Sequence, residues 1–327
     1  MYDVITFGSA TIDIFLKPKG FKILKGKDFI TLKGICFPMG SKIEVDEFNS
    51  FMGGGGTNTA VTFARQGLSV AYCGSIGDDL AGQEVINELK RTNIDSQFVS
   101  RTKERKTNHS IIITALKSRE DRTILVYRGA SEILREFPWD KLEAKWFYLA
   151  PLSGELCRSF GRIVDFAKDK GAKVAANPGL SQLSLPLGKL KPILQKIDVL
   201  ILNQEEASFL TKIPFQKEKE IFKKIDGFCP GIVIMTKGEK GAVVSDGRYI
   251  YSAKAPKIKV VDRTGAGDSF ASGFVSGFIQ SEGNIEYAFR LAMANSSACL
   301  TQLGAKNGLL SRGQSFEKVK IEKINES

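Results

Sequence analysis

The residues whose types and spacing suit chemistry gather in two glycine-rich turns. The first, GGGGTNTAVTFARQG at 53–67, has four glycines before a run with helical periodicity, which Gly67 ends. Glycine permits positive φ and lets a ligand approach the backbone closely, and the amide of Asn58 can donate to and accept from a hydroxylated ligand. No GK[ST] follows, so the turn is not a P-loop. It predicts either a hydroxyl-binding site or a plain flexible loop.

The second turn, DRTGAGDSF at 262–270, places Gly265, Ala266 and Gly267 directly before another helical run. Backbone N–H groups at a helix N-terminus have no partner within the helix, and the helix dipole also favours negative charge there. The turn therefore predicts an anion site. Asp268 is either a helix-capping or first-turn acid, or a base that takes the proton of a hydroxyl group attacking a bound phosphoryl group.

The elements around these turns follow a repeating pattern. Short apolar, β-branched runs alternate with stretches of 3.6-residue periodicity, which is typical of an α/β fold with a mostly parallel sheet and helices on both faces. In such folds ligands bind beyond the carboxyl ends of the strands. The polar residues that end these runs are therefore candidates, and they include Asp13, Asn177, Asn203 and Thr236.

Two segments break this alternation. Residues 14–52 contain strand-like pieces and turns but no clear helix, and residues 109–129 have the pattern of a two-stranded hairpin. From the residues alone, these segments either form a small sheet that stands off the main domain or extend one edge of the main sheet.

Composition narrows the class of protein. The chain has 327 residues, 43% hydrophobic and 25% charged, as in an ordinary globular protein. No apolar run approaches the roughly 18 residues that a membrane span needs, and no secretory signal is present. The cysteines show no metal-ligand spacing with the single histidine, His109. We therefore expect a soluble, cytoplasmic protein with reduced thiols at Cys36, Cys73, Cys157, Cys229 and Cys299.

The net charge of +11 raises the question of a nucleic-acid partner. The lysines and arginines are interleaved with acids along the chain, and no aromatic and basic recognition motif accompanies them. We expect no nucleic acid as a partner. A basic balance also suits an anionic small substrate such as a nucleotide, because the summed field helps to recruit it.

Several strings, in order and spacing, resemble the motifs of the ribokinase or PfkB family of carbohydrate kinases. GGGGTNTA at 53–60 and DRTGAGDSF at 262–270 resemble its two signature motifs. NQEE at 203–206 is similar to its N-x-x-E, and TKGEKG at 236–241 to its T-x-G-x-x-G nucleotide loop. MANSSA at 293–298 lies where its adenine pocket usually is. The resemblance covers nearly the whole chain.

The resemblance implies a fold and a domain organisation. Residues 1–327 would form one ribokinase-like domain, a three-layer α/β sandwich with a mostly parallel central sheet and a small β-sheet lid. The lid would come from about 14–52 and 107–130, which favours the sheet that stands off the domain. An exposed lid sheet with open edges would also offer a surface for a homodimer.

The resemblance also implies the roles of the candidate residues. Asp268 would be the catalytic base, and the amides of Gly265, Ala266 and Gly267 would form the anion hole. The acceptor hydroxyl groups would meet Asp13, Gly54 and Asn58. The nucleotide site would contain Asn203, Glu206, Thr236, Gly238, Gly241 and Asn295.

Two cations enter through the same resemblance. Glu206 would bind Mg²⁺ through water, with Asn203 one helical turn away on the same face. Asp262 and Thr264 would hold a monovalent cation such as K⁺. The role of Arg263, between them, is left open.

The implied activity is an ATP-dependent phosphotransferase that phosphorylates a hydroxymethyl group of a small sugar. A nucleoside kinase with an adenosine-like acceptor is the alternative, and a nucleotide-binding protein without turnover is a third. Pro151 and Leu152 stand where a ribose-specific enzyme would present an acid, which argues against ribose itself.

Overall fold

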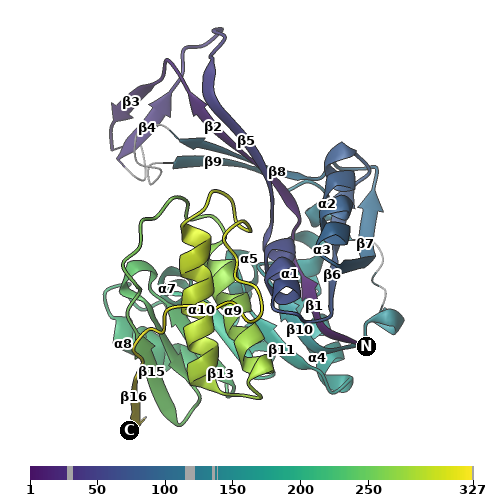
Figure 1. Cartoon of the computed structure of the whole chain (residues 1–327), viewed down its shortest axis with the longest axis vertical. Coiled ribbons are helices and arrows are strands. Elements are labelled where there is room, and N and C mark those ends of the chain that lie inside the picture. Colours follow the sequence, from purple (N-terminus) through teal and green to yellow (C-terminus); the bar gives the residue numbers. More distant parts are fainter. Residues whose placement is uncertain (28–31, 115–121, 135–136, 138, 326–327) are drawn as a thin grey trace.

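A large twisted sheet forms the centre of the molecule (Figure 1). The computed structural model describes residues 1–27, 32–114, 122–134, 137 and 139–325. In these residues the sheet has ten strands in the order β16-β15-β14-β13-β12-β11-β10-β1-β6-β7. From β13 to β7 in this order neighbouring strands are parallel, and from β13 to β16 they are antiparallel. The bounds are β1 (Tyr2–Phe7), β6 (Val70–Gly77), β7 (Ile94–Thr102), β10 (Ala144–Leu149), β11 (Lys173–Ala176), β12 (Val199–Asn203), β13 (Ile232–Thr236), β14 (Ala242–Ser245), β15 (Tyr249–Ala253) and β16 (Glu322–Asn325).

Helices cover both faces of this sheet, as the alternation of strand and helix patterns predicts. One face carries α1 (Gly55–Arg65), α2 (Leu80–Arg91), α9 (Ala266–Gln280) and α10 (Ile285–Leu300). The other carries α3 (Gly154–Arg158), α4 (Phe160–Asp169), α5 (Leu180–Leu183), α6 (Leu187–Leu194), α7 (Gln204–Thr211) and α8 (Glu218–Asp226). Short 3₁₀ turns are η1 (Ala130–Glu132), η2 (Trp139–Lys141) and η3 (Gly238–Lys240).

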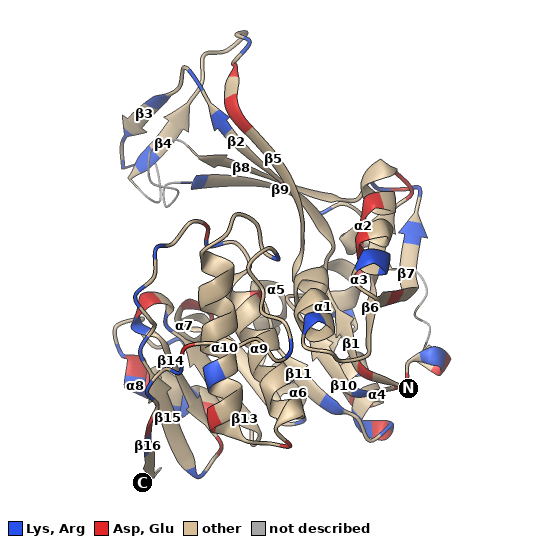
Figure 2. Cartoon of the chain, viewed as in Figure 1, with Lys and Arg blue, Asp and Glu red and all other residues tan. Residues whose placement is uncertain are grey.

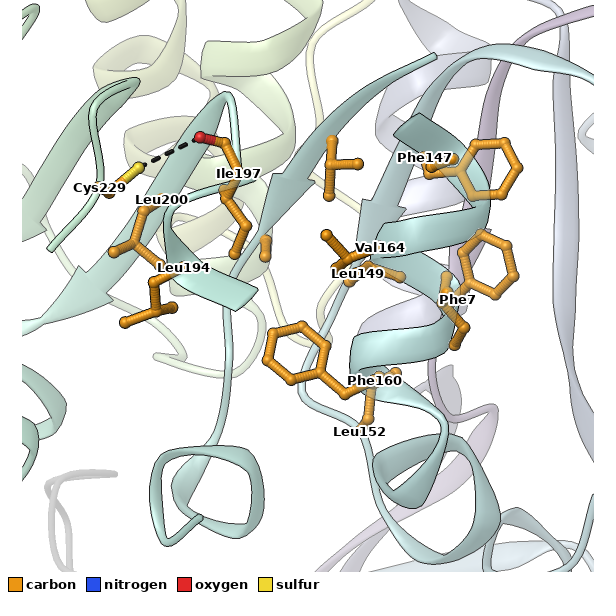
Figure 3. Packing of buried hydrophobic residues seen from close by; sticks show 14 of the residues in the cluster. Phe7, Phe147, Leu149, Leu152, Phe160, Val164, Leu194, Ile197, Leu200 and Cys229 are labelled. Carbon is orange, nitrogen blue, oxygen red and sulfur yellow. Dashed lines mark hydrogen bonds between the residues drawn. The ribbon is translucent and has the colours of Figure 1, made fainter. Parts of the chain in front are cut away.

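Two apolar cores hold the three layers together. Successive strand residues point to opposite faces, so Val4 belongs to the core under α1 and α9 whereas Ile5 belongs to the core under α4. Figure 3 shows part of the second core, where Phe160 and Val164 of α4 belong to the same cluster as Phe147 of the sheet. Burying each such side chain contributes roughly 1.5–3 kcal/mol, so the two cores position the strand ends rigidly.

The cysteines of the layers are free thiols, and most are buried. Cys229 donates to the carbonyl oxygen of Ile197 at 3.2 Å, as Figure 3 shows. Burial raises the pKa of the Cys229 thiol to about 12. The thiol is therefore protonated near neutral pH and unreactive as a nucleophile.

A second sheet stands off the layers and is called here the outer sheet (Figure 1). Its order is β5-β2-β8-β9, and its strands come from the two segments that break the helix and strand alternation. The hairpin expected at 109–129 is confirmed, because β8 and β9 pair antiparallel; its residues 115–121 lie outside the described residues. The bounds are β2 (Thr11–Pro18), β5 (Val45–Gly53), β8 (Asn108–Thr114) and β9 (Arg122–Tyr127), with a separate pair β3 (Lys22–Lys25) and β4 (Lys33–Cys36).

Charged side chains of both signs occur on the outer sheet and on the layers, as Figure 2 shows. The described helices include none that is both long enough and apolar enough to cross a membrane.

Candidate active site

The N-terminus of α9 lies at the bottom of the site. Gly265 is its N-cap with φ 76°, a left-handed conformation that favours glycine. A Cβ atom at Gly265 would also lie only 2.4 Å from the Cβ atom of Ala305. Only glycine therefore fits at this N-cap position. The Ala266 amide makes a long hydrogen bond of 3.4 Å to the carbonyl oxygen of Arg263, and the first-turn amides have no partner within the helix itself.

Asp268 does not cap this helix. The N-cap position is Gly265, and α9 has no side-chain cap hydrogen bond within the described part of the chain. Instead, Oδ2 of Asp268 accepts a hydrogen bond of 2.8 Å from Nδ2 of Asn58, which lies 210 residues earlier. Burial raises the pKa of Asp268, and the Asn58 hydrogen bond and the positive charge of Lys306 oppose that rise. The two glycine-rich turns thus meet through their polar side chains.

The first turn brings Asp13 into the same place. A Cβ atom at Gly53 would lie 1.9 Å from Oδ2 of Asp13, so only glycine leaves room for that carboxyl group. The pKa of Asp13 is raised to about 6, chiefly by burial and in part by nearby acids, although a hydrogen bond from Ser110 and the charge of Lys306 act to lower it. Asn58 is buried, and its Oδ1 has no hydrogen-bond partner among the described residues. A buried oxygen without a donor is costly, so a hydroxyl group of a ligand would be favoured there.

Lys306 is a buried cation behind the first turn, and the sequence analysis missed it. Its Nζ donates to Oε2 of Glu88 at 2.5 Å and to Oγ1 of Thr57 at 3.1 Å. Burial lowers the pKa of Lys306, while the negative charges of Glu88, Asp13 and Asp268 raise it. The side chain therefore supports the glycine turn and supplies positive charge to both aspartates.

Asn203 and Glu206 form a capping box at the start of α7. Oδ1 of Asn203 accepts from the Glu206 amide at 2.8 Å, and Oε2 of Glu206 accepts from the Asn203 amide at 2.9 Å. Burial raises the pKa of Glu206, and the negative charges of Glu205 and Asp268 raise it further. The capping box therefore fixes both oxygen-bearing side chains at the start of α7.

A cavity of about 670 Å³ lies beside the α9 N-terminus, between the strand ends and α10. Of the residues predicted for the nucleotide and anion sites, Thr236, Gly238, Gly241, Ala266 and Gly267 line it. Asn203 and Glu206 do not line it. The other lining residues are Glu239, Ala255, Pro256, Lys257, Ile258, Val260, Arg263, Phe270, Met293, Ser296, Ser297 and Leu300.

Asn295, which is expected at the nucleotide site, does not line this cavity. Its fully buried side chain donates to the carbonyl oxygen of Ser269 at 2.8 Å and accepts from the Leu310 amide at 2.9 Å. Asn295 thus ties α10 to α9 and to the C-terminal segment. The cavity is lined instead by Met293, Ser296, Ser297 and Leu300, whose i, i+3, i+4, i+7 spacing puts them on one helix face. This helical spacing is the sequence signal for the cavity-lining face, and the motif string MANSSA does not show it by itself.

Asp262 and Thr264 meet an arginine from the outer sheet. Nη1 of Arg122 donates to Oδ1 of Asp262 at 3.0 Å and to Oγ1 of Thr264 at 2.9 Å. Arg263 lines the cavity, and its Nη2 lies 2.9 Å from Oε1 of Glu239. This pair places Arg263 at the rim of the cavity.

Comparison with known proteins agrees with this geometry. Residues 1–312 match the model of the pfkB family carbohydrate kinases. The chain is 30% identical over 277 residues to a ribokinase of Haemophilus influenzae, a match that covers 81% of this chain and 86% of that protein.

Solved structures share the fold at lower identity. Ribokinase of Arabidopsis thaliana, complexed with ribose and ATP, has a TM-score of 0.77 at 22% identity, covering 95% of this chain and 96% of that chain. Nucleoside kinase of Burkholderia thailandensis, in complex with inosine, has a TM-score of 0.73 at 17% identity, covering 94% and 95%. The expected ribokinase-like sandwich with a large, mostly parallel sheet and a small separate sheet is therefore confirmed.

Proposed function

The chain belongs to the pfkB family of carbohydrate kinases, and from this premise we propose that it transfers the terminal phosphoryl group of ATP to a hydroxymethyl group of a small sugar. Family membership makes it an ATP-dependent sugar kinase. The finer proposal concerns the acceptor and the residues that act on it. One observation carries it, the hydrogen bond of 2.8 Å between Asn58 and Asp268, which joins the hydroxyl-binding turn to the anion site.

In the proposed mechanism, Asp13, Gly54 and Asn58 position the acceptor. The free oxygen of Asn58 accepts from one hydroxyl group, and the carboxylate of Asp13 accepts from another. Asp268 then takes the proton of the attacking hydroxymethyl oxygen, and the amides of Gly265, Ala266 and Gly267 stabilise the negative charge that develops on the phosphoryl group. ATP would lie in the cavity between the strand ends and α10.

The residues at the start of α7 fit a magnesium ion. Glu206, with Asn203 beside it, would hold the ion through water, because carboxylate and amide oxygens are the ligand types that Mg²⁺ takes. Mg²⁺, when bound, supplies positive charge to the phosphate oxygens. We further propose that the outer sheet, from about 14–52 and 107–130 of the single domain 1–327, is a lid that excludes water, which otherwise competes as the acceptor.

A nucleoside is the second candidate acceptor. Phe51 of β5 lies against Gly304, where a Cβ atom would be 2.9 Å from Cγ of the ring, and Gly304 itself donates to Asp262. An aromatic ring this close to the anion site suits a base. However, Phe51 also packs edge-to-face on Phe15 with ring centroids 5.8 Å apart, which is enough to explain it as part of the outer sheet's own core. A nucleotide-binding protein without turnover remains the third reading.

A coupled assay of ADP release tests these readings. The panel contains pentoses, hexoses, keto-acid sugars, sugar phosphates and nucleosides at matched concentration. We expect release that depends on a sugar with a primary hydroxyl group and exceeds the rate without acceptor. Release with nucleosides alone would favour the second candidate, and the lack of ADP release with every acceptor in the panel would favour the third.

Removal of the acceptor-binding groups should weaken binding of the acceptor and leave binding of ATP nearly unchanged. We expect Asn58→Ala and Asp13→Ala each to raise the acceptor KM by about 10- to 100-fold, the equivalent of a lost hydrogen bond of roughly 1.5–3 kcal/mol. Binding of ATP, measured by calorimetry, should change by less than about threefold. Asn87→Ala, on the surface of α2, is the matched control. Equal losses for both ligands would contradict the assignment.

We also propose that two copies associate through the outer sheet. Its edge strand β9 exposes the apolar side chains of Ile124, Leu125, Val126 and Tyr127, each 44–57% accessible. An open apolar edge of this kind favours pairing with another strand. We expect sedimentation at twice the mass of one chain and a monomer for Val126→Lys; a wild-type chain that sediments as a monomer at micromolar concentration would contradict the proposal.

Location in the cytoplasm and the lack of a nucleic-acid partner stay predictions.

A further inference from the structure

The carboxylate of Asp262 accepts four hydrogen bonds from the protein. Oδ1 accepts from Nη1 of Arg122 at 3.0 Å, from the Thr264 amide at 3.1 Å and from Oγ1 of Thr264 at 2.9 Å. Oδ2 accepts from the Gly304 amide at 3.0 Å. Oδ1, which faces Arg122 and Thr264, thus accepts from three donors, although a carboxylate oxygen has about two lone-pair sites, whereas Oδ2 accepts from one. Asp262 is only 4% accessible, so the arrangement is enclosed by protein.

The positive charge at this position comes from the protein itself. A buried carboxylate without a countercharge is costly, and Arg122, whose side chain is 24% accessible, supplies that charge. The same Nη1 atom donates to Oγ1 of Thr264, so both side chains expected to bind a monovalent cation are already engaged. A potassium ion at Asp262 and Thr264 would have to displace the guanidinium group or lie beside its like charge. The residues present therefore do not fit the expected cation.

Arg122 also connects distant parts of the molecule. It is the first residue of β9, the edge strand of the outer sheet, whereas Thr264 directly precedes the N-cap of α9. We propose that Arg122 replaces a monovalent cation beside the anion site, so that turnover does not depend on K⁺ and requires the outer sheet to be seated over α9. This inference rests on the proposed function for its kinetic part and on the ion pair alone for its binding part.

The first experiment compares cations at constant ionic strength, in tetramethylammonium, Na⁺ and K⁺ chloride. For the wild-type chain we expect turnover within about twofold in the three salts and the same midpoint of thermal unfolding. For Arg122→Met we expect turnover at least about tenfold lower in tetramethylammonium, since one charge-assisted hydrogen bond is worth roughly 1.5–3 kcal/mol. In this variant K⁺ should restore part of the turnover and raise the unfolding midpoint, because Asp262 and Thr264 become accessible to the ion.

Two further variants make the result specific. Arg122→Lys keeps the charge and should remain independent of K⁺. Arg101→Met, which removes a surface arginine of β7 bonded to Gln83, should behave as the wild type. The proposal is overturned if K⁺ activates the wild-type chain tenfold or raises its unfolding midpoint, or if Arg122→Met responds to no cation and turns over normally. The unfolding midpoints need no acceptor, so a failure of the proposed kinase reaction would leave this part of the test intact.

Discussion

Asp268→Asn should lower kcat by about 10²- to 10⁴-fold, the range by which a positioned general base contributes. The amide has the shape of the carboxylate and can still accept from Asn58, but it cannot take the proton of the attacking hydroxyl group. Binding of ATP should be preserved within about threefold, since Asp268 does not line the cavity between the strand ends and α10. Steady-state ADP release and calorimetric titration with a non-hydrolysable ATP analogue measure the two quantities.

Asp79 provides the control for this experiment, because it is a true helix cap. Its Oδ1 accepts from the Gly82 amide at 2.8 Å at the start of α2. Asp79→Ala should cost at least about 1 kcal/mol of unfolding free energy, since Thr107 also donates to this carboxylate, and it should leave kcat unchanged. If Asp268→Asn behaved in the same way, with a small stability loss and normal turnover, Asp268 would be a structural acid.

Lys306→Met should reduce the free energy of unfolding by about 3–5 kcal/mol, the cost of leaving one member of a buried ion pair without its partner. The group left behind is Glu88, whose Oε2 lies 2.5 Å from Nζ of Lys306. Urea denaturation measures the loss. The double substitution Glu88→Gln with Lys306→Met removes both charges and should recover most of it.

The same double variant tests the electrostatic role of Lys306 on a folded protein. The positive charge of Lys306 lowers the pKa values of Asp13 and Asp268. Without it both pKa values rise, so the fall of acceptor kcat/KM at low pH should begin at a higher pH than in the wild type. Lys320→Met, on the exposed C-terminal segment, is the control. If the double variant kept the wild-type pH profile and Lys306→Met kept the wild-type stability, Lys306 would neither stabilise the fold nor lower the pKa values of the two aspartates.

Much of the fold could be predicted because its signals are local. The short apolar runs in the sequence correspond to β1, β6, β10, β11, β12 and β13, and each of these strands lies in the large sheet. The two helices of the site begin at their glycine turns, because only glycine tolerates the contacts and left-handed φ found there. The sequence does not predict the strand Glu322–Asn325, because its residues are exposed at a sheet edge and only pairing with β15 makes it a strand.

The parts of the site that escaped prediction depend on contacts between distant residues. Arg122 and Asp262 are 140 residues apart, and Lys306 and Glu88 are 218 apart. No spacing in the sequence relates such pairs, because only the packing of the outer sheet and of the C-terminal segment brings them together. The motif string predicts Asn295 at the nucleotide site but does not reveal that its side chain bonds to Ser269 of α9, which depends on how the two helices pack.

The central claim is that a hydroxymethyl oxygen held beside Asp268 receives the phosphoryl group. Proton-coupled ³¹P NMR of the product formed from the best acceptor in the panel tests it most directly. The claim predicts a phosphate monoester resonance split into a triplet by the protons of one CH₂ group, and no such product with Asp268→Asn. A doublet, which marks a secondary or anomeric position, or inorganic phosphate alone would contradict it.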